Sequence, residues 1–451
     1  MKNRRDEKGF LLIAVLVITM LASMVALSLM FRLQAEQASF AASAGSEQAW
    51  YAAMSGIQQG MQVAKSSAFD PAMWENNPAF HHQLVYDDGS DKWYFSVYCA
   101  APAEETEARP GLIDENRKLH LNKATAEMLQ KCTTLPPAVI QQMAPDINTS
   151  TNSLTVEDLI FGTAPRPHFS TLDDVLKVPG ATPGMIYGED ANHNFHLDPN
   201  EDDGQLQFPP DDSDGQLFLG LQEVATVYSY EFDRASDGSP RIQLNSSKEK
   251  LPEGLLPDKT AQFIELAWSN KRLFSSPVVL LEAKEKFKDD KGKEVEAESG
   301  VGAKELPVIL DKLTTSFNPR LVGLINVNTA SVKVLGSLPG LDETKAESIV
   351  TARESLTMDQ RQSIAWLYRE GLLDAAQFKK LAPLITTQSL QFRFNVVGYA
   401  IPSGRYRVFE VVIDTADKQP QILYLRDISR FGLPFALPTG DETSNVVQTK
   451  S

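Results

Sequence analysis

Oxygen-bearing side chains recur at alternate positions in residues 188–204, GEDANHNFHLDPNEDDG. In a twelve-residue calcium loop, oxygens at positions one, three, five, nine and twelve surround one Ca²⁺, and position seven contributes its backbone carbonyl. Read in this register, the segment predicts calcium as cofactor, with the ligands Asp190, Asn192, Asn194, His196 (through its carbonyl), Asp198 and Glu201.

Two features depart from a complete helix–loop–helix calcium site. Phe195 stands at position six, where calcium loops carry glycine for a sharp turn, and Pro199 disfavours a following helix. The alternative is a metal-free surface turn, because Asn and Asp also stabilise turns through their own backbone. His193 and His196 do not predict zinc, since neither a thiol nor a third histidine is near them in the sequence.

Signatures of catalysis are missing from the sequence. It contains no GxSxG elbow, no phosphate-binding GxxxxGK[ST] loop, no HExxH and no CxxC. We therefore expect that the chain is not an enzyme. Cys99 and Cys132 could pair or stay free, and their spacing does not indicate a metal site.

The chain is acidic, with a net charge of −16 and a pI of about 4.9. Affinity for nucleic acid comes mainly from Lys and Arg that neutralise phosphates, so this balance argues against a nucleic-acid partner. The length of 451 residues allows two or three domains.

Residues 10–31 carry no charged side chain. As a helix they would rise ~33 Å, enough to cross a hydrocarbon core of about 30 Å. The preceding leader is net basic, which predicts a cytoplasmic N-terminus and a large body on the far side of one membrane span. A cleaved secretory signal is the alternative, disfavoured because the apolar run is longer than a usual signal core.

Helical and extended patterns follow the apolar run. Residues 32–66 predict a continuing helix whose apolar side chains pack on a sheet, namely Trp50, Met54, Ile57 and Met61. Alternating, aromatic-rich segments predict strands at residues 92–99, 390–400, 405–414 and 421–429. A sheet that begins near residue 92 and is completed after 390 implies a large insertion.

The insertion contains a degenerate internal repeat. LHLNKATAEML at residues 119–129 resembles INVNTASVKVL at 325–335, and a helix-hairpin-helix pattern follows the second copy at 337–353. A similar Val-Pro-Gly turn lies within residues 172–187. The charged segment 284–302 predicts a loop.

In their order along the chain, these motifs resemble those of the K-type minor pseudopilins of type II secretion, which are prepilin-like proteins. The basic leader ending in Gly9-Phe10 is similar to a prepilin processing site, and Ala14 stands where most prepilins carry glutamate as fifth mature residue. The resemblance implies an α+β fold, with a long N-terminal helix on an antiparallel sheet and a mainly helical insertion. The implied divisions are a leader (1–9), a transmembrane segment (10–31), the helix and first strand (32–110), the insertion (111–386), the final strands (387–432) and a disordered tail (433–451).

The resemblance also implies a function. Such a subunit would sit at the tip of a pseudopilus, nucleate its assembly and support protein export across the outer membrane. Its partners would be the other minor pseudopilins, the major pseudopilin, the prepilin peptidase, the inner-membrane secretion platform and membrane lipid. It would be a single-pass protein of the inner (cytoplasmic) membrane with a periplasmic body.

A membrane-anchored DNA receptor of a competence-type or pilus-type uptake system is the alternative function, because helix-hairpin-helix units often bind DNA through backbone N–H groups. The hairpin at Gly340-Leu341 is followed by Asp342, whose carboxylate would occupy those groups and repel phosphate. The first repeat reads Leu135-Pro136-Pro137 and has no hairpin glycine. These residues favour a protein scaffold.

The processing site gives a direct test. We expect the protein extracted from its native membrane to begin at Phe10, with a methylated amine, because the Gly9–Phe10 bond matches the prepilin pattern. Intact mass and N-terminal sequencing measure this. A chain that begins at Met1 or beyond Ala44 would contradict the resemblance.

Overall fold

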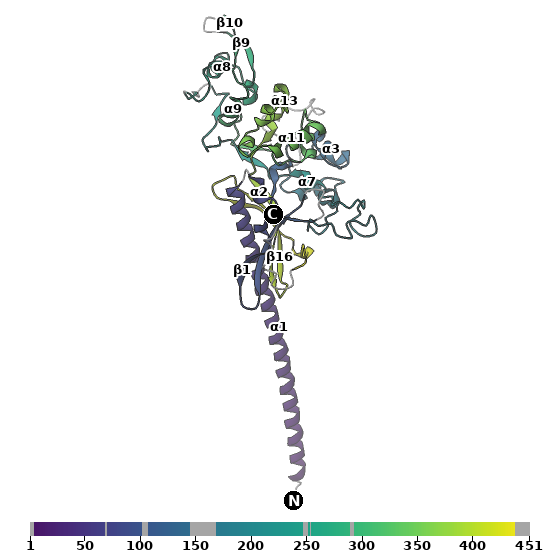
Figure 1. Cartoon of the computed structure of the whole chain (residues 1–451). Helices are drawn as coiled ribbons and strands as arrows, with labels where there is room; N and C mark the ends of the chain where they lie inside the picture. The colour runs from purple at the N-terminus through teal and green to yellow at the C-terminus, as the bar shows by residue number, and fades with distance from the viewer. Residues whose placement is uncertain are drawn as a thin grey trace, which may run out of the picture.

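The computed structural model describes residues 4–67, 70–101, 107–144, 168–246, 251–252, 254–288 and 293–437, with the backbone alone for residues 4–10. A single helix, α1 (Arg4–Ser66), projects from an elongated head (Figure 1). The sheet lies where α1 enters the head, and the inserted helices lie beyond it. The fold is α+β, as the sequence predicts.

Helix α1 has 63 residues and contains no proline. Its first half presents large apolar side chains to the surroundings, and Leu11 to Phe31 are more than half exposed at nearly every such position. From Gly45 onward one face is buried. The helix is thus divided into a free apolar half and a half that packs on the head.

Seven strands form the main sheet, in the order β1-β2-β15-β16-β17, with β3 on β2 and β4 on β15. All of the pairings are antiparallel. The strands are β1 (Gln83–Asp87), β2 (Lys92–Cys99), β3 (Arg109–Pro110), β4 (Ile113–Asp114), β15 (Gln391–Ile401), β16 (Tyr406–Asp414) and β17 (Gln421–Asp427). Strand β15 is central and almost fully buried, so distant parts of the sequence build one sheet around it.

One face of the sheet packs against α1. Ile57 and Met61 join Phe95, Phe394 and Val396 in a single apolar core. Trp50 is an exception to the predicted stripe: it is 36% exposed and meets Tyr51 edge-on. Helix and strand approach closest at Gly398, where a Cβ would lie 2.1 Å from the carbonyl oxygen of Ala49.

The opposite face of the sheet is covered by the insertion and by the chain after β17. Val397 and Tyr399 share a core with Phe195 and Leu219 of the insertion. The sequence predicts a disordered tail from residue 433, whereas Leu433, Phe435 and Leu437 pack on this core. Apolar side chains at alternate positions explain the difference, and residues 438–451 lie outside the described part of the chain.

The internal repeat has the same backbone arrangement in both copies. Strand β5 (Leu119–His120) pairs in parallel with β6 (Ala225–Thr226), and β13 (Ile325–Asn326) pairs in parallel with β14 (Ile385–Thr386). In each copy, the backbone N–H of the residue after the first strand donates to a carbonyl of the partner strand. Leu121 donates to the carbonyl of Thr226 at 2.8 Å, and Val327 donates to the carbonyl of Thr386 at 3.0 Å.

A hairpin of two helices follows the first strand of each pair. The first consists of α3 (Ala126–Cys132) and α4 (Pro137–Met143), and the second of α10 (Val332–Gly336) and α11 (Glu343–Ser355). The Pro179-Gly180 turn, the third turn of this kind in the insertion, joins η4 (Leu172–Lys177) to α6 (Pro183–Tyr187). Leu129, Leu335 and Ile349 belong to one continuous core, so the hairpins pack as a unit.

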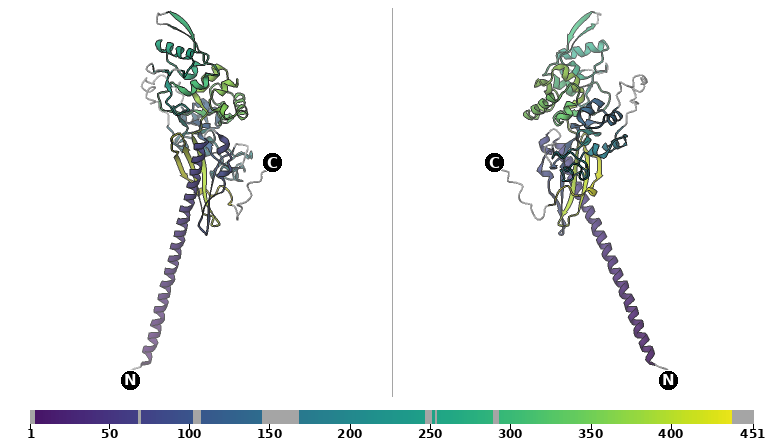
Figure 2. Two further views of the ribbon diagram at one scale, coloured as in Figure 1. Left: turned by 60° about the vertical axis from the view of Figure 1, so that its left-hand side comes forward. Right: turned by 90° about the vertical axis from the view of Figure 1, so that its right-hand side faces the viewer.

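A smaller core lies at the end of the head farthest from the free half of α1 (Figure 2). It includes Phe263 of α8 (Asp258–Ser269) and Ile309 of α9 (Leu306–Lys312). The predicted loop at 284–302 is wrong, because β9 (Lys284–Lys288) and β10 (Glu294–Glu298) form a hairpin. Cross-strand Lys–Glu pairs such as Lys284–Glu298, at 2.8 Å, stabilise this charged ribbon, and Phe287 anchors it.

Short elements complete the head. They are α2 (Pro71–Trp74), η1 (Pro78–Phe80), η2 (Glu115–Arg117), α7 (Leu221–Val224), β7 (Tyr230–Phe232), β8 (Ile242–Gln243), η5 (Pro277–Leu280), β11 (Leu313–Thr314), β12 (Arg320–Val322), η6 (Asp359–Arg361), α12 (Trp366–Arg369), α13 (Ala375–Leu381), η7 (Ala382–Leu384) and η8 (Ser429–Phe431).

The close approach of α1 and β15 can be tested by substitution. We expect Gly398→Ala to lower the free energy of unfolding by about 1–3 kcal/mol, because the new methyl group overlaps the backbone of Ala49 and Ala53. Gly184→Ala is the matched control, since nothing lies within 4 Å of its added Cβ. Denaturant unfolding of the detergent-solubilised chain measures both variants, and equal stabilities would contradict this packing.

Candidate functional site

The predicted calcium loop is closely wound around Asp190. This carboxylate is fully buried and accepts backbone N–H bonds from Asn194 at 3.0 Å and Phe195 at 3.2 Å. Glu201, at the other end of the loop, accepts from the N–H of Ala191 at 3.0 Å and of Asp198 at 3.2 Å. The structure therefore brings the first and last predicted ligands to the same turn.

The remaining predicted ligands are bound to one another. The Asp198 carboxylate accepts from the side-chain amides of Asn192 at 2.6 Å and Asn194 at 2.9 Å. The N–H of His196 donates to the Asn194 side-chain oxygen at 2.7 Å. In the part of the chain that the structure describes, no group of three or more His, Cys, Asp or Glu side chains is arranged to hold a metal ion.

Burial governs the electrostatics of the loop. Desolvation, followed by the repulsion of Glu201, raises the pKa of Asp190 to about 8. Desolvation likewise raises the pKa of Glu201 to about 7. Two carboxylates are thus held in a poorly solvated turn where their negative charges repel each other.

Phe195 explains how the loop forms without its usual glycine. Its φ of 59° lies in the left-handed region that favours glycine, so the backbone at position six bends as in a calcium loop. The ring is buried edge-on against Tyr98 of β2, and the side-chain amide of Asn395 donates to the His193 carbonyl at 2.9 Å. These contacts fasten the loop to the sheet.

The processing residues lie within α1. The backbone of Gly9 and Phe10 is helical and continuous with the apolar half. One helix of the described residues, Leu11–Ser66, is long and apolar enough to span a membrane, and none of its most apolar window is buried in the head.

In the second hairpin, the second helix, α11, begins with an acidic cap. The Asp342 carboxylate accepts from the backbone N–H of Lys345 at 2.9 Å, as the sequence predicts. Gly340, with φ of 86°, makes the turn, and nothing lies within 4 Å of an added Cβ there. In the first hairpin, α4 begins at Pro137 without a side-chain cap. The exposed turn of the second hairpin thus presents an occupied helix N-terminus.

Residues 322–386 match a family model described as a helix-hairpin-helix motif. The chain therefore contains this motif, and the match covers α10, α11 and the helices up to β14. No curated protein matches the chain.

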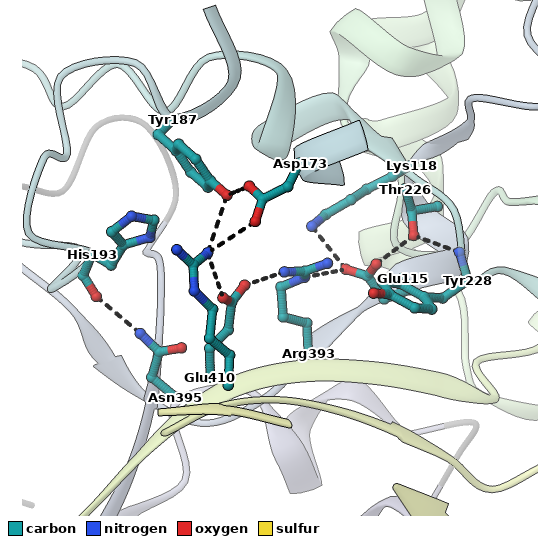
Figure 3. Close-up of polar contacts among 11 residues, drawn as sticks. Glu115, Lys118, Asp173, Tyr187, His193, Thr226, Tyr228, Arg393, Asn395 and Glu410 are labelled. Carbon is teal, nitrogen blue, oxygen red and sulfur yellow. Dashed lines mark hydrogen bonds and ion pairs between the residues drawn. The ribbon is translucent and has the colours of Figure 1, made fainter. Parts of the chain in front are cut away.

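A buried cluster of charges, which sequence reasoning missed, joins the insertion to the sheet (Figure 3). Glu115 accepts from Lys118 at 2.9 Å and from Arg393 at 3.2 Å, and Arg393 also donates to Glu410. Burial by itself would raise the pKa of Glu115, but Lys118 and Arg393 lower it to about 2. Glu115 is therefore ionised at neutral pH.

The cluster extends across the sheet to the third turn of the insertion. Arg426 of β17 lies 4.0 Å from Glu410 and 3.3 Å from Asp173 of η4. Tyr187 of α6 donates to Asp173. Charges of alternating sign thus run from η2 over three strands to η4, and each buried charge meets its opposite.

Asp114 lies beside this cluster and is also fully buried. Its carboxylate accepts from the Asn326 amide at 3.0 Å, the Thr329 hydroxyl at 2.7 Å, the Ser389 hydroxyl at 2.7 Å and the Asn116 N–H at 2.9 Å. Burial outweighs these bonds and raises the pKa of Asp114 to about 6. One side chain thus links the start of the insertion, the second repeat and the return to β15.

One sequence signal for this cluster exists. Arg393 is the single charge in LQFRFNVVGYA, and Glu410 lies between apolar residues in RYRVFEVVID. A charge at a core position of a strand requires a partner of opposite charge, because an unpaired buried charge is costly. This rule identifies the two strand residues, but Glu115, the partner of Arg393 in the insertion, lies more than two hundred residues away in the chain.

Asp114 predicts a specific dependence of stability on pH. Its folded pKa of about 6 exceeds the ordinary 3.8, so its contribution to stability is full below pH 4 and is lost as pH rises through 6. The difference in unfolding free energy between wild type and Asp114→Asn should therefore fall by about 3 kcal/mol over this window and stay constant above it.

Denaturant unfolding at a series of pH values measures this difference. Other acids that titrate in the same window cancel because both chains contain them. Asp359→Asn, at an exposed position, is the control and should leave the pH profile unchanged. A wild type-to-variant difference that stays constant between pH 4 and 7 would contradict the buried state of Asp114.

Proposed function

We propose that this chain is a K-type minor pseudopilin that caps and nucleates the pseudopilus of a type II secretion system. The observation that carries the proposal is the division of α1: a free apolar half leads into a sheet that bears a head inserted between β4 and β15. On this proposal the chain is not an enzyme, and it acts by assembly.

Sterics favour the tip of the filament. Pilin-like subunits assemble by packing their apolar helices side by side, which requires narrow heads. The insertion, with its hairpin core and its distal core, makes this head far wider than α1 alone (Figure 2). A wide head fits at the end, where no subunit follows, and Ala14 lacks the carboxylate that would meet the amine of a neighbour.

Partners and location follow from this proposal. The apolar half of α1 would contact membrane lipid, then the helices of the major pseudopilin and of the other minor pseudopilins. The prepilin peptidase would cut after Gly9, and the inner-membrane platform would add subunits beneath the head. The head would lie in the periplasm, above a single span of the inner membrane.

A DNA receptor is the second candidate, because the helix-hairpin-helix match is compatible with it as well as with a pseudopilin. The occupied N-terminus of α11 and the net charge of −16 weigh against it. If the hairpin did bind phosphate, Asp342→Ser would strengthen binding, since serine keeps a cap but removes the charge.

We also propose calcium as a structural ligand of the 190–201 loop. The support is the register of its oxygen-bearing side chains together with the left-handed backbone at Phe195. Asp190, Asn192, Asn194, Asp198, Glu201 and the carbonyl of His196 would hold the ion, and they would exchange their present mutual hydrogen bonds for it. A bound Ca²⁺ would neutralise charge in the turn and stabilise the cover of the sheet.

Calcium binding is tested by thermal unfolding of the purified, chelator-treated chain. Ca²⁺ should raise the unfolding temperature and Mg²⁺ should not, because the loop offers flexible oxygen ligands rather than an octahedral site. Glu201→Gln should raise the Ca²⁺ concentration needed for this stabilisation about tenfold or more. Glu127→Gln, at an exposed position of α3, should leave that concentration unchanged. Equal responses to both cations, or none, would mean that the loop is a metal-free turn.

The proposed function is tested by deleting the gene and comparing exported proteins with those retained in the cell. We expect export to fail in the deletion strain. It should return when the strain expresses the wild-type chain or Ala14→Glu. It should stay defective when the strain expresses a chain in which a short linker replaces residues 115–390. Labelled protein should be found at one end of each pseudopilus. Regular spacing along the shaft, or normal export with lost DNA uptake, would contradict the proposal and favour the alternative.

A further inference from the structure

A partly enclosed cavity of about 60 Å³ lies where the insertion meets the sheet. Ile113, Phe195 and Leu219 form part of its apolar wall. Its polar wall is formed by Arg117, Lys118, Gln222, Glu223 and Arg393. The cavity therefore combines a hydrocarbon surface with a concentration of cationic groups, beside the cluster drawn in Figure 3.

Positive charge exceeds negative charge in this wall. Three cations line the cavity, whereas Glu223 is the one carboxylate in the lining, and it also lies 3.8 Å from Lys333. The side chains of Lys118 and Arg393 are only 4% and 7% exposed. Glu115 does not line the cavity, and it accepts hydrogen bonds from both of these cations. It uses one of the three N–H donors of the Lys118 ammonium group.

Gln222 supplies a second and independent observation. The residue is 6% exposed, and its Nε2 is buried without a hydrogen-bond partner among the described residues. Buried amide donors are nearly always paired, because an unpaired one forfeits its bonds to water. Gln222 also lines the cavity, so its side chain needs to turn toward the cavity for an acceptor atom bound there to satisfy this amide.

We propose that the cavity binds a carboxylate carried by a short apolar group, with the oxygens on Arg117, Lys118 and Gln222 and the hydrocarbon against Phe195 and Leu219. The volume has room for about four water-sized positions, at ~15 Å³ each. That corresponds to the head of a short-chain acid. The proposal is independent of the pseudopilin function.

The electrostatics agree with an anionic ligand. Burial, and then the neighbouring Arg393 and Arg117, lower the pKa of Lys118, although Glu115 opposes them. An added carboxylate would favour the charged ammonium form. The same head group occurs in a free acid and at the C-terminus of a peptide, so the ligand series must separate these two sources.

Calorimetric titration of the detergent-solubilised full chain, in chloride buffer at fixed ionic strength, tests the site. The probes are butyrate against butyramide, and a peptide ending in Ala-Val as free acid against its C-terminal amide. We expect each acid to bind at least about tenfold more tightly than its amide, because charge-assisted hydrogen bonds are the stronger class. A tighter peptide acid identifies a chain terminus as the source, and a tighter butyrate identifies a small metabolite.

Three variants locate the binding. Arg117→Gln should weaken the acids about tenfold, and Ala101→Leu should abolish binding by filling the cavity without removing a charge. Arg369→Gln removes the same charge from an exposed position on α12 and should change nothing. Equal binding of acids and amides, no binding of any probe, or acid binding that survives Ala101→Leu would overturn the proposal.

Discussion

The carboxylate of Asp114 is the constraint on which the head depends. It is fully buried, and its four donors come from η2, the second repeat and the segment before β15. A buried carboxylate is tolerated only when donors surround it, and removing one leaves a charge without solvation. The three segments are therefore held in one arrangement, although the first lies more than two hundred residues before the other two in the sequence.

The adjacent ion pairs extend this constraint over the sheet. A sheet with only one face packed, here on α1, would leave its other face to water. Here Glu115, Arg393, Glu410 and Arg426 join that face to the insertion (Figure 3). The acidic loop, held by Phe195 and Asn395, and the segment through Phe435 cover the rest. The insertion is thus part of the sheet's own packing, which fixes the head relative to α1.

Local patterns in the sequence predict much of this fold, and long-range contacts explain what they miss. Apolar length and alternation identify α1, β2, β15, β16 and β17, because these periods are local. Strand β1, the β9–β10 ribbon and the packed residues 433–437 are missed, because cross-strand pairs and tertiary contacts stabilise them. The hairpin cap at Asp342 is predicted, whereas Asp114 acquires its role from donors that lie far away in the chain.

The central claim is that the insertion and the sheet unfold as one unit because Asp114 and its neighbouring ion pairs join them. Native-state hydrogen exchange of the detergent-solubilised chain tests this most directly. Amides of Phe394 and Val396 in β15 should open with the same free energy as those of Ala346 and Ile349 in α11, within about 1 kcal/mol. Exchange of the α11 amides at an opening free energy several kcal/mol lower, while β15 stays protected, would contradict the account.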